Sequence, residues 1–293
     1  MPAREPIPCV VFAFQECALA RKTLDALSLL GDRLSITVVE NRSDLTDEVL
    51  KPYFLELLRS ERIDRYIAFR ANITNNALEI AFENYLVPLG SSEFVLITDA
   101  DVEPDRPDWL DEQIAILRAH PDVMLCGVGL SKANLPIAAF PEAARWIPDP
   151  AAIHEDYVET KQSGVHLWLI RTAALRAVLR YRLVTGKRFV DATFAAYCAR
   201  AGCKWALTKK AEAKHLVWDL YAERDHRYTR QKKTTSYSRT WCHYRYVACD
   251  LFTRERRQVC YPFFQWAQLP YTIGLRWLAK LCMFRPRALS RVR

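Results

Sequence analysis

The sequence contains no C-x-x-C pair and no long apolar run, and both absences narrow the class of protein. Its 9 Cys are scattered along 293 residues, which argues against a structural zinc site and against the disulfide framework of a small secreted protein. No run of about 18 or more apolar residues occurs, so no single helix is predicted to cross a bilayer. The apolar run near the N-terminus is too short for a signal peptide. We therefore expect a cytoplasmic protein.

Glycine is scarce, with 8 residues in the chain, and charge is distributed unevenly. Residues 220–293 hold 16 Lys and Arg against 4 Asp and Glu, whereas residues 1–219 hold 26 against 30. A chain of this length forms about one or two domains. We predict a globular domain over residues 1–220, followed by a basic, aromatic and helical extension over residues 221–293.

Strand-like and helix-like segments alternate along the first 130 residues. Predicted strands cover residues 8–14, 34–39, 66–69, 94–98 and 123–129, and predicted helices cover residues 18–30, 45–59, 75–86 and 108–119. This alternation is typical of β-α-β units, so the predicted fold class is α/β with a mainly parallel central sheet flanked by helices. A Pro-rich surface loop is predicted at 131–160, and a strand at 165–170 and helices at 172–181 and 192–201 follow it.

Polar residues follow three of the predicted strands. Gln15 and Glu16 follow the first strand, Glu40 and Asn41 the second, and Asp99 and Asp101 the fourth. Ligands of parallel sheets bind beyond the carboxyl ends of the strands. These side chains are therefore predicted to share one crevice.

The two aspartates, Asp99 and Asp101, end an otherwise apolar strand and lie two residues apart. Carboxylate oxygens with open coordination positions suit Mg²⁺ or Mn²⁺ that bridges the phosphates of a nucleotide. An alternative is that the pair caps the turn and helix that follow. The other polar residues expected at the same crevice favour the cation site.

Four segments, in order, resemble the motifs of nucleotide-sugar glycosyltransferases with the GT-A fold, nearest to the inverting family 2. The segments are residues 10–16 for the opening strand, 38–44 for the second strand, 72–77 for a helix entry, and 96–101 with 107–110 for the Asp-x-Asp region. The resemblance covers about residues 7–220. The sequence departs from the family at Arg42 and Thr74, where Gly is usual.

The resemblance implies a Rossmann-like GT-A fold with a nucleotide-binding half at about residues 1–130 and an acceptor-binding half at about 131–220. The implied nucleotide contacts are Phe12, Phe14, Glu40, Asn41, Asn72, Asp99, Ala100 and Asp101. The implied cofactor is Mn²⁺ or Mg²⁺, with Asp99, Asp101 and His215 as its ligands. Outside this context a lone His is more often an ordinary surface or hydrogen-bonded residue, so that interpretation of His215 stays open.

Asp191 opens a predicted helix within residues 188–194, a segment that resembles the acceptor side of the family. An inverting transferase needs a base that removes a proton from the acceptor hydroxyl. The resemblance gives this catalytic role to Asp191, although the family commonly has Glu before this Asp and here Val190 precedes it. The alternative is that Asp191 only caps the helix.

These residues together predict a metal-dependent, inverting glycosyltransferase. It would move a sugar from a nucleotide-diphosphate donor to a saccharide or lipid-linked acceptor in cell-surface polysaccharide or glycolipid assembly. A sugar-phosphate nucleotidyltransferase would need a Gly-rich loop after the first strand, and residues 12–16 contain no Gly. A membrane-associated, non-catalytic protein with a degenerate transferase domain is the other alternative.

The C-terminal residues 237–293 combine many Arg with Tyr, Trp and Phe. The apolar stretch 269–284 carries embedded Arg and Lys, as do helices that lie in a membrane interface. This pattern predicts a peripheral contact with anionic lipid at the cytoplasmic face of a membrane. Alternatives are packing against the catalytic domain or a dimer interface. Nucleic acid is an unlikely partner, because no binding module is recognisable.

Overall fold

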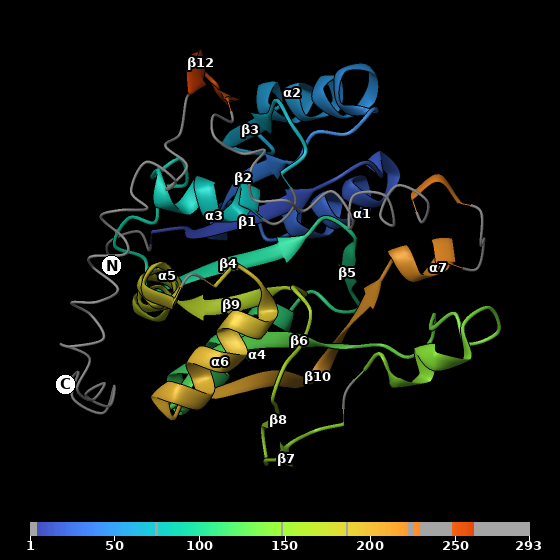
Figure 1. Ribbon diagram of the computed structural model, residues 1–293, viewed down its shortest axis with the longest axis vertical. Helices are drawn as coiled ribbons and strands as arrows, with labels where there is room; N and C mark the ends of the chain where they lie inside the picture. Colours follow the sequence, from blue (N-terminus) through green and yellow to red (C-terminus); the bar gives the residue numbers. More distant parts are fainter. Residues whose placement is uncertain are drawn as a thin grey trace.

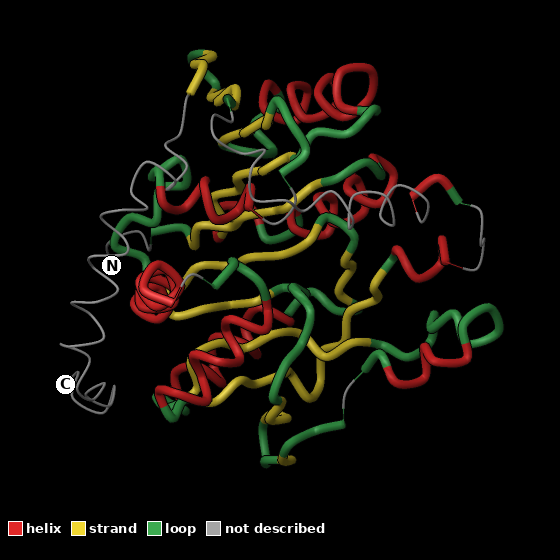
Figure 2. The backbone as a smooth tube through the Cα atoms, viewed as in Figure 1, coloured by secondary structure: helices red, strands yellow, loops and turns green. Residues whose placement is uncertain are grey.

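A computed structural model of the chain describes residues 5–73, 76–147, 149–185, 187–221, 226–228 and 248–260. These residues form a 12-stranded mixed sheet with helices on both faces (Figure 1). The predicted α/β class is therefore confirmed. Figure 2 shows how the strands run through the middle of the molecule with helices on either side.

The sheet has the strand order β12-β11-β3-β2-β1-β4-β9-β6-β10-β8-β7, and β5 pairs with β10 beside this path. The strands are β1 (Ile7–Ala13), β2 (Leu34–Glu40), β3 (Arg65–Phe69), β4 (Phe94–Asp99), β5 (Val102–Pro104), β6 (Val123–Leu130), β7 (Ala152–Ile153), β8 (Tyr157–Thr160), β9 (Trp168–Arg171), β10 (Lys204–His215), β11 (Cys249–Thr253) and β12 (Arg257–Cys260). The helices are α1 (Cys17–Ser28), α2 (Lys51–Arg59), α3 (Asn76–Glu83), α4 (Trp109–Ala119), α5 (Thr172–Thr185), α6 (Asp191–Ala201) and α7 (Val217–Tyr221). Short helical turns are η1 (Gly31–Arg33), η2 (Thr46–Leu50) and η3 (Pro141–Arg145).

Parallel pairing is confined to two parts of the sheet. Strands β3, β2, β1 and β4 run parallel to one another, and β6 runs parallel to β10. All other pairs among the described strands are antiparallel, so the prediction of a mainly parallel sheet is wrong for the sheet as a whole. The reason is β9, which lies between β4 and β6 and runs opposite to both. The chain reaches β9 through residues 131–167, in which no crossover helix is present among the described residues.

The central strands are buried on both faces, as their continuous apolar sequences predict. Cys9, Val11 and Ala13 of β1 face one core with α1, α2 and α4. Val10 of the same strand faces a second core with α3, α5 and α6. Burying one large apolar side chain contributes about 1.5–3 kcal/mol. Two such cores therefore hold the strand ends in fixed positions, which a site at the sheet edge requires.

The predicted helical extension is wrong over residues 249–260, because these residues form the hairpin β11–β12. Strand β11 pairs antiparallel with β3 at the edge of the parallel strands. Phe252 stacks on Tyr66 with ring centroids 5.3 Å apart and an interplanar angle of 14°. Tertiary pairing with β3 thus fixes this segment as strand. Residues 261–293, which include the predicted membrane-interface stretch, lie outside the described residues.

Among the helices of the described residues, none combines the length and the apolar character that a bilayer crossing requires.

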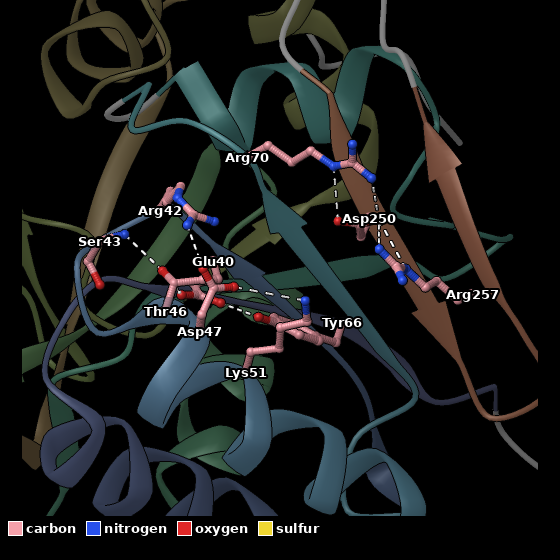
Figure 3. Close-up of polar contacts among 10 residues, drawn as sticks. All are labelled: Glu40, Arg42, Ser43, Thr46, Asp47, Lys51, Tyr66, Arg70, Asp250 and Arg257. Atoms are coloured by element: carbon pink, nitrogen blue, oxygen red, sulfur yellow. Dashed lines mark hydrogen bonds and ion pairs between the residues drawn. The ribbon is translucent and has the colours of Figure 1, made fainter.

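A cluster of charged side chains fixes the hairpin to β3 (Figure 3). Asp250 of β11 is 5% exposed and accepts hydrogen bonds from Arg70 at 3.1 and 2.9 Å. It also accepts hydrogen bonds from Arg257 of β12 at 3.2 and 2.9 Å. The hydrogen bonds from Arg70 lower the pKa of Asp250, those from Arg257 add to this, and burial opposes both. The two guanidinium groups therefore favour the ionised form of this carboxyl.

Replacing Asp250 by Ala should lower the free energy of unfolding by about 1–3 kcal/mol, because charge-assisted hydrogen bonds to two partly exposed Arg side chains are lost. The folded-state pKa of Asp250 is below its unfolded value of about 3.9, so the contribution is present above that value and is lost as pH falls through the folded-state pKa. Urea unfolding at a series of pH values measures both effects. Asp47→Ala removes a carboxylate that is 56% exposed and serves as the control. If both variants lowered the free energy of unfolding equally, Asp250 would not stabilise the fold more than an exposed carboxylate does.

Candidate functional site at the carboxyl ends of the parallel strands

Backbone hydrogen bonds join the loops that follow β2 and β4 to the end of β1. Asn41 N donates to Ala13 O at 3.0 Å, and Ala100 N donates to Phe12 O at 2.9 Å. Phe12, Phe14, Asn41 and Ala100 therefore lie at one edge of the sheet, as the sequence predicts. Phe12 and Phe14 are partly buried, and Ala100 is 7% exposed.

Gln15 is the most unusual residue of this edge. It has a φ of 68°, in the left-handed region, and Glu16 N donates to Phe14 O at 2.8 Å across it. Its side chain is fully buried, and neither amide atom has a hydrogen-bond partner among the described residues. Backbone strain and an unsatisfied buried amide are both unfavourable, and both concentrate at functional sites. The sequence showed only that Gln15 follows a strand, since its amide environment depends on the folded loops.

Asn41 ties the loop after β2 to the loop after β3. Its Nδ2 donates to Asn72 Oδ1 at 2.5 Å, and its Oδ1 accepts a hydrogen bond from Ile73 N at 2.8 Å. Two residues that the sequence assigns to the nucleotide, Asn41 and Asn72, are thus in contact. Their side chains fix the relative position of the two loops.

Glu40 is also at the end of β2, yet its carboxylate faces the protein interior (Figure 3). Oε1 accepts a hydrogen bond from Thr46 Oγ1 at 2.5 Å, and Oε2 accepts one from the Tyr66 hydroxyl. Burial raises the pKa of Glu40, and the hydrogen bonds from Thr46 and Tyr66 partly offset that effect. The carboxylate therefore holds the loop at residues 41–46, and its contact with a nucleotide stays a prediction.

Glu40→Gln is expected to leave nucleotide affinity within about threefold of wild type, since the loop-holding geometry does not need a charge. The folded-state pKa is raised, so the stability that this group contributes is present below the unfolded pKa and is lost as pH rises through the folded-state pKa. Gln should then give equal or higher stability at pH 7. Calorimetric titration with nucleoside diphosphates and chemical unfolding measure the two quantities. A loss of affinity of about tenfold or more would establish direct contact with the nucleotide.

Asp101 and His215 come together from distant parts of the chain. His215 Nε2 lies 3.5 Å from Asp101 Oδ2, and their side chains are 12% and 17% exposed. Antiparallel pairing of β5 with the end of β10 places them, together with a hydrogen bond from Leu216 N to Asp101 O at 2.7 Å. Asp99 is partly buried at the end of β4, where its backbone N donates to Val165 O at 3.1 Å.

The described residues contain no group of three or more His, Cys, Asp or Glu side chains that could hold a metal ion. Of the three predicted ligands, Asp99, Asp101 and His215, the structure brings the side chains of Asp101 and His215 together. A carboxylate and an imidazole at that separation can bind one cation together, with further oxygen ligands from phosphate or water.

His166 lies beside this pair, with its ring centroid 4.7 Å from that of His215. A Cβ atom added to Gly164 would lie 2.4 Å from His166 Nε2, so Gly164 allows the imidazole to take this position. Leu167 has a φ of 49°, again in the left-handed region. The segment at residues 164–167 is thus shaped to bring His166 against His215.

Asp191 is the first residue of α6, and Val190 is the N-cap. The alternative that Asp191 serves as the N-cap is therefore wrong. Asp191 Oδ2 accepts a hydrogen bond from Gln162 Nε2 at 2.7 Å, and Oδ1 accepts one from Ala192 N at 2.8 Å. Gln162 is three residues before Val165, whose carbonyl contacts Asp99. One short segment therefore connects Asp191 with the end of β4.

Arg227 carries positive charge to the same edge. It forms an ion pair with Asp44 in the loop after β2, and its hydrogen bond lowers the pKa of Asp44. Burial raises the pKa of Glu16, and His226 and Arg227 oppose that shift through their charge. Arg227 therefore lies near the loops after both β1 and β2. Four further basic residues near Arg227 in the sequence, Arg224, Arg230, Lys232 and Lys233, lie outside the described residues.

Three uncharacterized proteins of Acanthamoeba polyphaga mimivirus are similar to this chain. One is 35% identical over 239 residues, which are 80% of this chain and 48% of the viral protein. A second is 35% identical over 231 residues, covering 77% of this chain and 31% of its own length. A third is 32% identical over 260 residues, which are 87% of this chain and 29% of the viral protein. The chain thus spans about half the length, or less, of the curated relatives it matches. No protein-family model matches the chain.

Proposed function

We propose that this chain is a metal-dependent, inverting glycosyltransferase of the GT-A fold, similar to family 2. The donor is a nucleotide-diphosphate sugar, and the acceptor is a saccharide or a lipid-linked saccharide of cell-surface polysaccharide or glycolipid assembly. The four parallel strands β3-β2-β1-β4 support this proposal, because sheets of this kind bind ligands beyond their carboxyl ends.

The observation that carries the proposal is that the ends of β1, β2 and β4 lie together at one sheet edge, to which a short segment connects Asp191. Backbone hydrogen bonds join the loops after β2 and β4 to the end of β1, and residues 162–165 connect Asp191 to Asp99. Fold resemblance alone would be weak evidence, since one fold hosts many functions. Side chains with distinct chemical roles at one edge are stronger evidence.

The donor would bind over the ends of β1, β2 and β4. Phe12 and Phe14 offer ring surface to the nucleoside, and Asn41 and Asn72 position the loops around it. Arg227 would neutralise part of the diphosphate charge, because guanidinium groups bind phosphate through directed hydrogen bonds. Asp44, which now pairs with Arg227, would then exchange this partner for water.

A Mn²⁺ or Mg²⁺ ion fits beside this donor position. Asp101 and His215 would hold it, with diphosphate oxygens and water as further ligands, as is usual for cations that bind through few carboxylates. When bound, the ion stabilises negative charge on the departing diphosphate. Asp99, at the end of β4, would be a further ligand of this ion.

Asp191 would act on the acceptor. The acceptor oxygen forms a bond to the anomeric carbon, the bond from that carbon to the diphosphate oxygen breaks, and Asp191 Oδ2 or Oδ1 takes the hydroxyl proton. Gln162 fixes the carboxylate orientation through its hydrogen bond to Oδ2. Attack from the face opposite the diphosphate inverts the anomeric configuration, which NMR of the product reports.

Thermal-shift measurements with UDP, GDP and dTDP, each with and without Mn²⁺, test the proposal. A ligand at about 100 times its Kd stabilises the native state by about 2.7 kcal/mol, which raises Tm by about 5 °C or more for a chain of this size. We expect one nucleotide to give such a shift in a Mn²⁺-dependent way. Absence of a shift with all three, together with no release of nucleoside diphosphate from their common sugar conjugates, would favour a non-catalytic protein instead.

A further inference from the structure

Five aromatic side chains form a connected array on one side of the candidate site. This aromatic wall consists of Phe140 and Trp146 from the loop after β6, Trp218 and Tyr221 from α7, and Tyr228. The ring centroid of Trp146 lies 6.2 Å from that of Phe140, 6.2 Å from that of Trp218 and 5.7 Å from that of Tyr221. Tyr221 lies 6.4 Å from Tyr228. Figure 1 shows the loop after β6 and α7 on the side toward which β4 points.

The aromatic wall is continuous with the pair formed by Asp101 and His215. The ring of Trp218 meets the ring of His215 edge-on, with centroids 4.9 Å apart and an interplanar angle of 69°. His215 in turn lies beside Asp101. Any molecule bound along the wall therefore ends next to the position proposed for the donor diphosphate.

Trp146 gives the wall an accessible face. Trp218 is only 5% exposed, whereas Trp146 is 37% exposed although it contacts three other rings of the wall. Packing against those rings holds the indole in place without burying it. A rigid aromatic face open to solvent is ready to bind a flat apolar surface.

Polar groups border the wall beside His215. Asn134 Nδ2 donates to His215 O at 2.8 Å and to Asp219 Oδ1 at 3.2 Å. Lys214 Nζ lies 3.1 Å from Asp219 Oδ2, and both side chains are partly exposed. Lys214 and Asp219 therefore place exposed charged groups at this border.

We propose that the aromatic wall binds a pyranose ring of a neutral oligosaccharide acceptor. One face of a pyranose presents C–H groups to the negative face of an aromatic ring, and its equatorial hydroxyls reach outward to polar groups at the border. The wall with Asn134, Lys214 and Asp219 offers both kinds of contact. A hydrocarbon chain would desolvate this charged border without offering it a hydrogen bond, which is unfavourable. This inference rests on the proposed transferase function and specifies its acceptor class.

The test measures binding of hexasaccharides to the full-length protein. Intrinsic Trp fluorescence and saturation-transfer NMR are recorded with the β-1,4-linked hexasaccharides of glucose and of N-acetylglucosamine and the α-1,4-linked hexasaccharide of glucose. At least one should bind, and Trp146→Ala should weaken that binding by about tenfold. Trp146→Phe, which keeps an aromatic ring, should weaken the binding of that hexasaccharide much less.

Two comparisons separate a loss of the wall from a loss of the fold. Tyr85 is an aromatic residue outside the wall that is 89% exposed and has a φ of 56°, so Tyr85→Asn is the matched control. It should bind the hexasaccharide like wild type. Trp146→Ala should keep the wild-type Tm and the nucleotide-induced shift of Tm.

The outcomes also separate this inference from the proposed function. Nucleotide binding without binding of any hexasaccharide would leave the transferase proposal standing and overturn the role of the wall. Hexasaccharide binding that Trp146→Ala does not weaken would overturn it as well. Hexasaccharide binding that depends on Trp146, in a protein that binds no nucleotide, would support the wall and remove the transferase proposal.

Discussion

Replacing Asp191 by Asn should lower the rate of sugar transfer by about 10²–10⁴-fold, which is the usual contribution of a positioned general base. Nucleotide binding should stay at the wild-type level, because Asp191 contacts Gln162 rather than the strand-end loops and is proposed to act on the acceptor. Asn has nearly the same size as Asp, but its amide cannot take up the proton of the acceptor hydroxyl. Initial rates with a donor sugar and an acceptor, together with calorimetric nucleotide titration, measure the two effects.

Two further variants make this test specific. Asp32→Asn changes an exposed carboxylate before β2, at the opposite end of that strand, and should leave both quantities unchanged. Gln162→Ala removes the hydrogen bond that orients Asp191 and should lower kcat more than it changes KM. Loss of nucleotide binding in Asp191→Asn with an unchanged Tm would move this residue to the donor side and contradict its role as base.

Replacing Asp101 by Asn should abolish the Mn²⁺-dependent part of nucleotide binding. Asp101 is the carboxylate paired with His215, and the amide that replaces it is a neutral and much weaker ligand for a divalent cation. The expected readout is loss of the Mn²⁺-dependent increase in Tm, about 5 °C at saturating nucleotide. Binding measured in the presence of a chelator should be equal in wild type and variant.

The ligand-free Tm of Asp101→Asn shows whether the side chain is also structural. A value close to that of wild type means that the lost increase reports on cation binding. A Mn²⁺-dependent increase in Tm that persists in Asp101→Asn would exclude Asp101 as a ligand. If Asp191→Asn lost binding while Asp101→Asn kept it, the two role assignments would be reversed.

The first 130 residues could be predicted well from the sequence, because their signals are local. The apolar runs that became β1, β2, β4 and β6 are bounded by polar residues, and the helices between them have regular apolar spacing. Even here local features were missed. The predicted helix at 45–59 begins with the π-helical turn η2 before α2, and α3 ends earlier than its pattern suggests.

Strand β10 could not be predicted, since its middle reads as a polar, helix-favouring segment with two adjacent Lys and an Ala-Glu-Ala run. It becomes a strand by pairing with β6, β8 and β5, contacts that no local pattern records. Strand β11 was missed for the same reason, because its partner β3 is far away in the sequence. Tertiary pairing overrides local preference at such positions.

In the candidate site, too, some features follow from the local sequence and others depend on tertiary contacts. The convergence of the loops after β1, β2 and β4 follows from strand order and was predictable. The environment of individual side chains was not. Glu40 looked like a ligand contact, and the fold places its carboxylate between Thr46 and Tyr66. The strain at Gln15 and the contact of His166 with His215 depend on loop conformations that no motif specifies.

The docking of β11–β12 on β3 has a consequence for synthesis and for engineered fragments. Until residue 260 has left the ribosome, the outer backbone edge of β3 has no β11 to pair with, so its N–H and C=O groups remain open to pairing with other chains. A fragment that stops at residue 220, where composition alone would cut the chain, would keep that edge open permanently. Such a fragment should aggregate during expression, whereas one that extends through the hairpin should stay monodisperse.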